Sequence, residues 1–258
     1  ATARLNFSQS FNGVGSMFAT LVVGSFLFQS ESAGDGSNAV IPYSIMGALV
    51  LLIAIVFSRV NLPEIQHTDD KETQQGGHNI SRLFKNRSFV FGLSALLAYE
   101  VAEISINSYF INYVTGQGWM EPATASTVLT VGLGLFMLAR FIGAAVMSKV
   151  PAEKYLLICA VGTVACIAVL LLDMGRNISM AALMMNYFFE AIMFPTIFAL
   201  ALRGLGGLTK SASSILMMTP VGGCGFLLMG YAADHAGNFV LPFFIPLVGY
   251  AIVMAYAW

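Results

Sequence analysis

The sequence predicts an all-α integral membrane protein with eight transmembrane helices, and three observations support this fold class. Of the 258 residues, 57% are hydrophobic and only 10% are charged, whereas soluble globular proteins carry about 25% charged residues. The mean hydropathy is +0.79. Apolar runs of about 20 residues, each long enough to cross a bilayer as a helix, recur along the chain between polar connectors.

The eight predicted spans follow from these runs in order. They are residues 7–29, 39–59, 88–114, 122–148, 154–173, 178–201, 211–233 and 238–258. The first opens with amides and glycines in RLNFSQSFNGVGS, and the third carries two glutamates. Pro195 and Pro220 interrupt the sixth and seventh spans, where we expect bends. The small residues of the seventh favour close helix packing, and the remaining Met- and Phe-rich spans are expected to face lipid or the core.

Residues 60–87 form the one long connector, which is polar, charged and contains adjacent glycines. We predict a flexible cytoplasmic linker that ends in a basic amphipathic stretch and separates two bundles, residues 1–59 and residues 88–258. In the second bundle, three spans that begin inside precede three that begin outside. Such a three-plus-three inverted repeat is typical of one half of a major facilitator.

The orientation of the chain follows from its basic residues, which stay on the cytoplasmic side of a membrane. Alternate connectors contain Arg4, Arg59, Lys71, Arg82, Lys85, Arg87, Lys149, Lys154, Arg203 and Lys210, whereas the opposite connectors contain only Arg176. Both ends of the chain are therefore predicted to be cytoplasmic. The net charge of −1 and the lack of a basic face do not favour a nucleic-acid partner.

Cofactor and metal chemistry find little support in the sequence. The cysteines Cys159, Cys166 and Cys224 all lie inside apolar runs, and their odd number and wide spacing favour neither a disulfide framework nor a zinc site. The histidines fall in connectors without a second ligand at metal spacing. No phosphate loop, zinc-protease motif or nucleophile elbow is present, so an enzyme is not predicted.

Acidic side chains stand in the middle of two spans. Glu103 lies 15 residues after Ser88, or ~22 Å along a helix, and Glu190 lies 12 residues after Ile178, or ~18 Å from the opposite surface. Both carboxyl groups are thus near the midplane. An ionised carboxylate there costs ~2.5–3.5 kcal/mol, so protonation near neutral pH becomes accessible. The alternative is a permanently protonated acid that links neighbouring helices.

Amides accompany both acids at helical spacing. Asn107 follows Glu103 by one turn, with Tyr99 on the same stripe, and Asn186 precedes Glu190 by one turn. The two spans begin the two inverted repeats, so the polar stripes are expected at corresponding positions. The closeness of Glu100 to Glu103 disfavours ionisation of both.

Two further features lie near the cytoplasmic surface. Gln9 and Asn12 share a face of the first span and either bind solute hydroxyls or cap and pack the helix start. Arg140 lies near the cytoplasmic end of the fourth span and is expected to extend to the interface.

A family resemblance adds to this interpretation. The segment FPTIFALALRGLGGLTKSASSILMMTPVGGCGFLLMGYAAD (194–234) resembles the hallmark segment of the fucose–galactose–glucose:proton symporters, a branch of the major facilitator superfamily. RLNFSQSFNGVGS resembles the start of that family's fifth helix, SYFINYVTGQG the end of its seventh, and ARFIGAAVM its eighth. The resemblance implies that this chain holds helices five to twelve of twelve, with residues 1–59 as the last two helices of the N-terminal bundle.

The resemblance also implies roles for particular residues. Gln9 and Asn12 match the fifth-helix Gln and Asn near the sugar. Glu103 is similar to an acidic position in the seventh helix of some members, whereas Glu100 and Glu190 depart from the bacterial pattern. The family's two proton-handling carboxylates lie on helices one and four, upstream of Ala1.

The sequence therefore predicts a proton-coupled monosaccharide symporter of the cell membrane that acts by alternating access, as a monomer, with protons in place of any cofactor. The predicted sugar-binding residues are Gln9, Asn12, Tyr99, Glu103, Asn107, Asn186 and Glu190, and the proton-coupling candidates are Glu103, Glu100 and Glu190. A uniporter or facilitator of the same fold for another small solute is the alternative. A membrane sugar sensor that does not transport is a weaker one.

Overall fold

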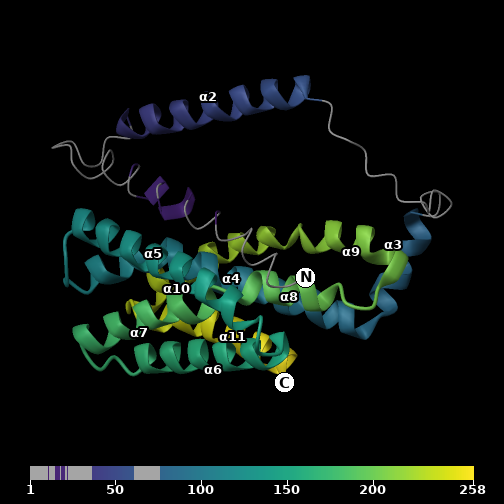
Figure 1. Cartoon of the computed structure of the whole chain (residues 1–258). Coiled ribbons are helices and arrows are strands. Elements are labelled where there is room, and N and C mark those ends of the chain that lie inside the picture. The colour runs from purple at the N-terminus through teal and green to yellow at the C-terminus, as the bar shows by residue number, and fades with distance from the viewer. Residues whose placement is uncertain (1–10, 12–14, 18, 21, 23–36, 61–75) are drawn as a thin grey trace.

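A computed structural model gives the fold and describes residues 11, 15–17, 19–20, 22, 37–60 and 76–258. All regular structure in this part of the chain is helical (Figure 1). The α-helices are α2 (Ser37–Arg59), α3 (Gly76–Lys85), α4 (Arg87–Gly116), α5 (Pro122–Val146), α6 (Ala152–Leu171), α7 (Arg176–Glu190), α8 (Met193–Ala201), α9 (Thr209–Leu216), α10 (Phe226–Ala236) and α11 (Phe244–Ala257). Short 3-10 helices are η2 (Gly206–Leu208), η3 (Thr219–Gly225) and η4 (Leu241–Phe243).

The predicted fold class is confirmed by helix length and composition. Within the described residues, five helical stretches are long and apolar enough to cross a membrane: α4, α5, α6, α7 with α8, and η2 through α10. Two shorter apolar helices, Tyr43–Arg59 and Leu241–Ala257, fall on the predicted second and eighth spans. Most of the predicted first span lies outside the described residues.

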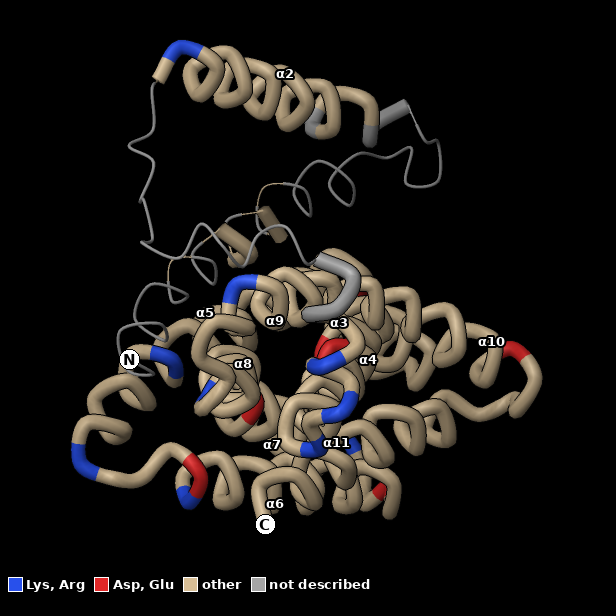
Figure 2. The backbone as a smooth tube through the Cα atoms, turned by 90° about the vertical axis from the view of Figure 1, so that its right-hand side faces the viewer, with Lys and Arg blue, Asp and Glu red and all other residues tan. Residues whose placement is uncertain are grey.

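Helix α4 is the centre of the bundle and packs against α5, α8, α10, α11 and η3, while α6 packs against α7 and α11. The approach of α11 to α4 depends on Gly249, because a Cβ at that position would lie 2.6 Å from the Ala98 carbonyl oxygen. The absence of a side chain lets the two backbones come within contact distance. Figure 2 shows how few charged residues the bundle carries.

The sixth and seventh spans are interrupted where the prolines predict bends. The sixth span divides into α7, which ends at Glu190, and α8, which begins at Met193. Proline has no N–H to donate to the carbonyl four residues earlier, so Pro195 leaves the Ala191 carbonyl without its usual helical partner. The seventh span divides into α9, η3 and α10 in the same way, with Pro220 at the start of η3.

Helix α2 lies outside the packed bundle, and α3 lies at its edge. Helix α2 runs apart from the bundle in both views (Figures 1 and 2), and its described apolar side chains are exposed. Helix α3 lies in the predicted linker and carries Arg82 and Lys85 in its last turn. Its Leu83 is fully buried, so this end of the predicted linker is fixed against the bundle.

Candidate functional site

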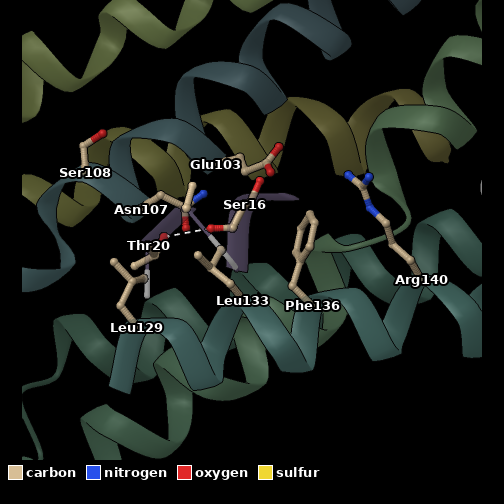
Figure 3. Close-up of a pocket in the computed structure, with 10 residues that line it drawn as sticks. Ser16, Thr20, Glu103, Asn107, Ser108, Leu129, Leu133, Phe136 and Arg140 are labelled. Atoms are coloured by element: carbon tan, nitrogen blue, oxygen red, sulfur yellow. Dashed lines mark hydrogen bonds between the residues drawn. The ribbon is translucent and has the colours of Figure 1, made fainter. Parts of the chain in front are cut away.

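A cavity of about 370 Å³ lies where helical residues 15–17 and 19–20 of the first predicted span approach α4 and α5 (Figure 3). It is lined by Ser16, Ala19, Thr20, Glu103, Asn107, Ser108, Leu129, Leu133, Phe136 and Arg140. Its volume is within the range of pockets that bind small molecules, about 300–1,000 Å³.

The polar wall of the cavity comes from α4. Glu103 and Asn107 are one helical turn apart, as the sequence predicts, and both side chains are half-buried. Hydroxyl groups of Ser16 and Thr20 face them from the N-terminal segment, where the Thr20 hydroxyl donates to the Ser16 carbonyl at 3.0 Å (Figure 3). Carboxyl, amide and hydroxyl groups can together donate and accept several hydrogen bonds to one small polar solute.

The opposite wall is apolar and belongs to α5. Leu129, Leu133 and Phe136 follow one another at spacings of four and three residues, which places them on one face of the helix. The cavity therefore presents hydrogen-bonding groups on one side and hydrocarbon on the other. This arrangement suits a solute with both polar and apolar faces.

Arg140 closes one end of the cavity and does not extend to the membrane surface as expected. Its side chain is only 3% exposed, and its Nε donates to the Ala191 carbonyl at 2.8 Å. The guanidinium carbon lies 4.5 Å from the centroid of the Phe136 ring, at cation–π distance. The prediction of an interfacial arginine is wrong because Pro195 frees a carbonyl inside the bundle for this cation to bind.

Glu190 and Asn186 form a separate, closed cluster with Tyr250 of α11. All three side chains are fully buried. Glu190 Oε2 accepts from Asn186 Nδ2 at 2.7 Å and from the Tyr250 hydroxyl, which also lies 3.4 Å from Asn186 Nδ2. Neither Asn186 nor Glu190 lines the cavity, so the structure does not bring the two predicted polar stripes into one chamber.

Tyr99 lies between the cavity and this cluster. Its side chain is fully buried, its hydroxyl donates to the Glu190 carbonyl at 3.2 Å, and its ring packs at 6.4 Å from that of Phe194. The same hydroxyl adjoins the Glu103 carboxyl group. The ring face that the sequence offers to a solute is therefore covered, and the Tyr99 hydroxyl lies between the Glu103 carboxyl group and the main-chain carbonyl of Glu190.

The other predicted site residues lie elsewhere. Glu100 is buried against η3 and does not line the cavity. A Cβ added to Gly222 of η3 would lie 3.2 Å from the Cβ of Glu100. Gln9 and Asn12 lie outside the described residues. In the part of the chain that the structure describes, no group of three or more His, Cys, Asp or Glu side chains could hold a metal ion.

Sequence reasoning missed four polar residues of the cavity wall, Ser16, Thr20, Ser108 and Arg140. Ser16 and Thr20 continue the face of Asn12 at intervals of four residues, so helical spacing could have found them. Arg140 stands within an apolar run one turn after Phe136. A charge inside a membrane span is itself a sign of a functional site, and that signal marks Arg140.

The fold and the cavity define a helical integral membrane protein with a solute-sized chamber between its first described helical residues and its six-helix bundle. Comparison with known families identifies it further, because the model of the Major Facilitator Superfamily matches residues 2–224. The chain belongs to this superfamily.

Individual relatives are similar over nearly the whole chain. A putative glucose/galactose transporter of Helicobacter pylori (strain J99) is 30% identical over 96% of this chain and 63% of its own. The L-fucose-proton symporter of Escherichia coli K12 is 28% identical over 98% of this chain and 63% of its own. The present chain thus spans 63% of the length of these curated relatives.

Solved structures show the same fold. The crystal structure of an Asn-to-Ala variant of the E. coli fucose:proton symporter FucP matches with a TM-score of 0.80 and 27% identity, over 99% of this chain and 68% of that one. FucP in the outward conformation matches with a TM-score of 0.79 and 28% identity, over 99% and 67% of the two chains. These relatives are transporters by name rather than enzymes.

Proposed function

We propose that this protein is a secondary active transporter that carries a monosaccharide of the fucose, galactose and glucose class together with protons. The observation that supports this function best is the two-faced cavity, in which Glu103 and Asn107 oppose an apolar wall. Its relatives are named for glucose, galactose and L-fucose, and proton coupling is part of the name of the fucose symporter. The protein is accordingly not an enzyme.

The proposed recognition uses both walls. Asn107, Ser16 and Thr20 exchange hydrogen bonds with sugar hydroxyls, since amides and hydroxyls both donate and accept. Leu133 and Phe136 contact the C–H face of the sugar ring. In this proposal Gln9 and Asn12 add further contacts from the first span.

The proposed proton carrier of this chain is Glu103, the acid on the cavity wall. The Arg140 side chain lies at the end of the cavity toward which the Glu103 carboxyl group is directed (Figure 3). Loss or gain of a proton at Glu103 therefore changes the charge facing the sugar. Glu100 and Glu190, which do not line the cavity, are secondary candidates, and no cofactor besides the proton is proposed.

The remaining proposals concern the setting of the transporter. By the distribution of basic residues, both ends of this chain face the cytoplasm, and the protein acts as a monomer in the cell membrane. Alternating access moves the two bundles around the central cavity, as expected for secondary transporters with inverted repeats.

Transport by vesicles containing the full-length protein tests this function. Addition of D-glucose, D-galactose or L-fucose is expected to cause proton uptake into the vesicles, and no proton uptake is expected without sugar. Glu103→Gln should change the pH dependence of transport, whereas Glu121→Gln, the same change at an exposed acid that makes no capping bond, should not. Sugar uptake without proton movement would favour the uniporter, and sugar binding without counterflow would favour the sensor.

A further inference from the structure

The break in the sixth span lies directly against the cavity-lining helices. Pro195 cannot donate to the Ala191 carbonyl, and Arg140 Nε donates to that oxygen at 2.8 Å instead. The neighbouring Glu190 carbonyl accepts from the Tyr99 hydroxyl at 3.2 Å. Side chains of α5 and α4 thus satisfy two successive carbonyl groups at the break.

Helix α5 is also shaped to fit the break. Gly143 lies three residues after Arg140, and a Cβ on Gly143 would overlap Cγ2 of Ile192. The lack of a side chain at Gly143 therefore lets the break pack onto α5 next to the arginine. The position of residues 191–192 relative to α5 is fixed by both steric fit and a hydrogen bond.

The same arginine faces the cavity. Arg140 is one of the residues that line it, and Figure 3 shows the guanidinium end of the side chain on the side of the cavity where Glu103 lies. Guanidinium is a rigid, planar group with five N–H donors. When its terminal nitrogens shift toward a cavity ligand, its Nε shifts with them, and the bond to Ala191 must change.

We propose that Arg140 is a positioning residue through which the occupant of the cavity sets the geometry of the break between α7 and α8. A sugar hydroxyl or an ionised Glu103 attracts the guanidinium group, and this attraction alters how firmly the Ala191 carbonyl is held. A ligand can shift a conformational equilibrium only through contacts that differ between its states, and the Arg140–Ala191 bond supplies such a contact. The proposal rests on the proposed function insofar as the occupant is a sugar.

The first test is made without sugar. It measures hydrogen–deuterium exchange of the amides in residues 190–196 of the full-length protein in lipid nanodiscs. Arg140→Met keeps the length of the side chain but removes the N–H that donates to Ala191. The amides of residues 190–196 should then exchange roughly tenfold faster or more, the size expected for a lost hydrogen bond to a charged donor. Pro195→Ala restores an N–H that can reach the Ala191 carbonyl. In that background Arg140→Met should have little further effect. Additive effects of the two substitutions would overturn the proposal.

A second arm adds saturating D-glucose, D-galactose or L-fucose. In the natural protein, bound sugar should change the exchange rates of the amides in residues 190–196. Asn107→Ala weakens sugar binding but leaves Arg140 in place, so this variant should show the same change when it is saturated with sugar. Arg140→Lys keeps the charge without the planar fork, so it should bind sugar but lose the change. Sugar binding with a change equal to that of the natural protein in Arg140→Lys would refute the inference.

The two hypotheses fail differently. If none of the sugars alters exchange anywhere in the protein, the proposed function fails, while the sugar-free cycle still decides whether Arg140 holds the break. If sugar alters exchange around Glu103 and Asn107 but never at residues 190–196, the transporter function stands and the positioning role is excluded.

Discussion

The buried cluster of Glu190, Asn186 and Tyr250 allows a quantitative prediction. Tyr250→Phe removes a hydroxyl that donates to Glu190 Oε2 and lies 3.4 Å from Asn186 Nδ2. The Asn186 bond at 2.7 Å remains, while Glu190 Oε1 has no partner among the described residues. A hydrogen bond to a charged group contributes about 1.5–3 kcal/mol, and one between neutral groups about 0.5–1.5 kcal/mol. We expect Tyr250→Phe to lower the free energy of unfolding by about 1–3 kcal/mol.

The assay is reversible unfolding in mixed micelles of a mild detergent and dodecyl sulfate. Tyr109→Phe is the matched control, because its hydroxyl makes one longer bond, 3.3 Å, to the Phe239 carbonyl of a neutral backbone. It should cost less than Tyr250→Phe. Glu190→Gln keeps an oxygen that can accept from both partners and should cost little. Glu190→Leu removes the acceptor, and in a double-mutant cycle with Tyr250→Phe the two substitutions should be non-additive by about 0.5 kcal/mol or more, in line with residues that share a network (about 0.5–3 kcal/mol).

Two results would show that the cluster does not stabilise the bundle as argued. One is a Tyr250→Phe variant within about 0.5 kcal/mol of the natural protein, the size of an ordinary surface substitution. The other is a Tyr250→Phe variant that is no less stable than Tyr109→Phe, since the tyrosine hydroxyl would then add nothing specific to its bond with Glu190.

Four further predictions concern the cavity and the packing of the bundle around it. Asn107→Ala should weaken sugar binding about fivefold to hundredfold, as loss of one or two hydrogen bonds implies, without changing unfolding. Asn186→Ala should instead lower stability, because its side chain lies in the buried cluster, and titration calorimetry with unfolding curves separates the two. Glu103→Gln should shift the pH profile of transport, and an identical profile would remove it from coupling. Gly249→Ala should destabilise by about 1–3 kcal/mol through overpacking against the Ala98 carbonyl, and an unchanged unfolding midpoint would contradict that contact.

Much of the fold follows from the sequence because membrane helices are specified locally. A run of about 20 apolar residues must form a helix in lipid, where backbone groups can be satisfied only within the segment. Helix α4, Arg87–Gly116, therefore coincides with the predicted span 88–114. The prolines likewise mark where α7 gives way to α8 and where η3 begins.

The candidate site was harder to predict from the sequence than the fold. Helical spacing tells on which face of its own helix a residue lies, but not which residues of other helices that face contacts. Glu103 with Asn107 and Glu190 with Asn186 have the same spacing. Only tertiary packing turns the first pair to a cavity and the second to Tyr250 of α11. Arg140 was misjudged for the same reason, since its partner carbonyl lies on a different span.

The difference between the third and sixth predicted spans has a local cause. Helix α4 contains no proline and runs unbroken past Glu103, which leaves that acid in mid-helix on the cavity wall. The sixth span contains Pro195, and α7 ends at Glu190, where the carboxyl group meets Tyr250. The break also frees the Ala191 carbonyl and so retains Arg140 inside the bundle. The proline thus accounts for the cation that faces the cavity acid, whereas the binding of Glu190 among side chains follows from tertiary packing.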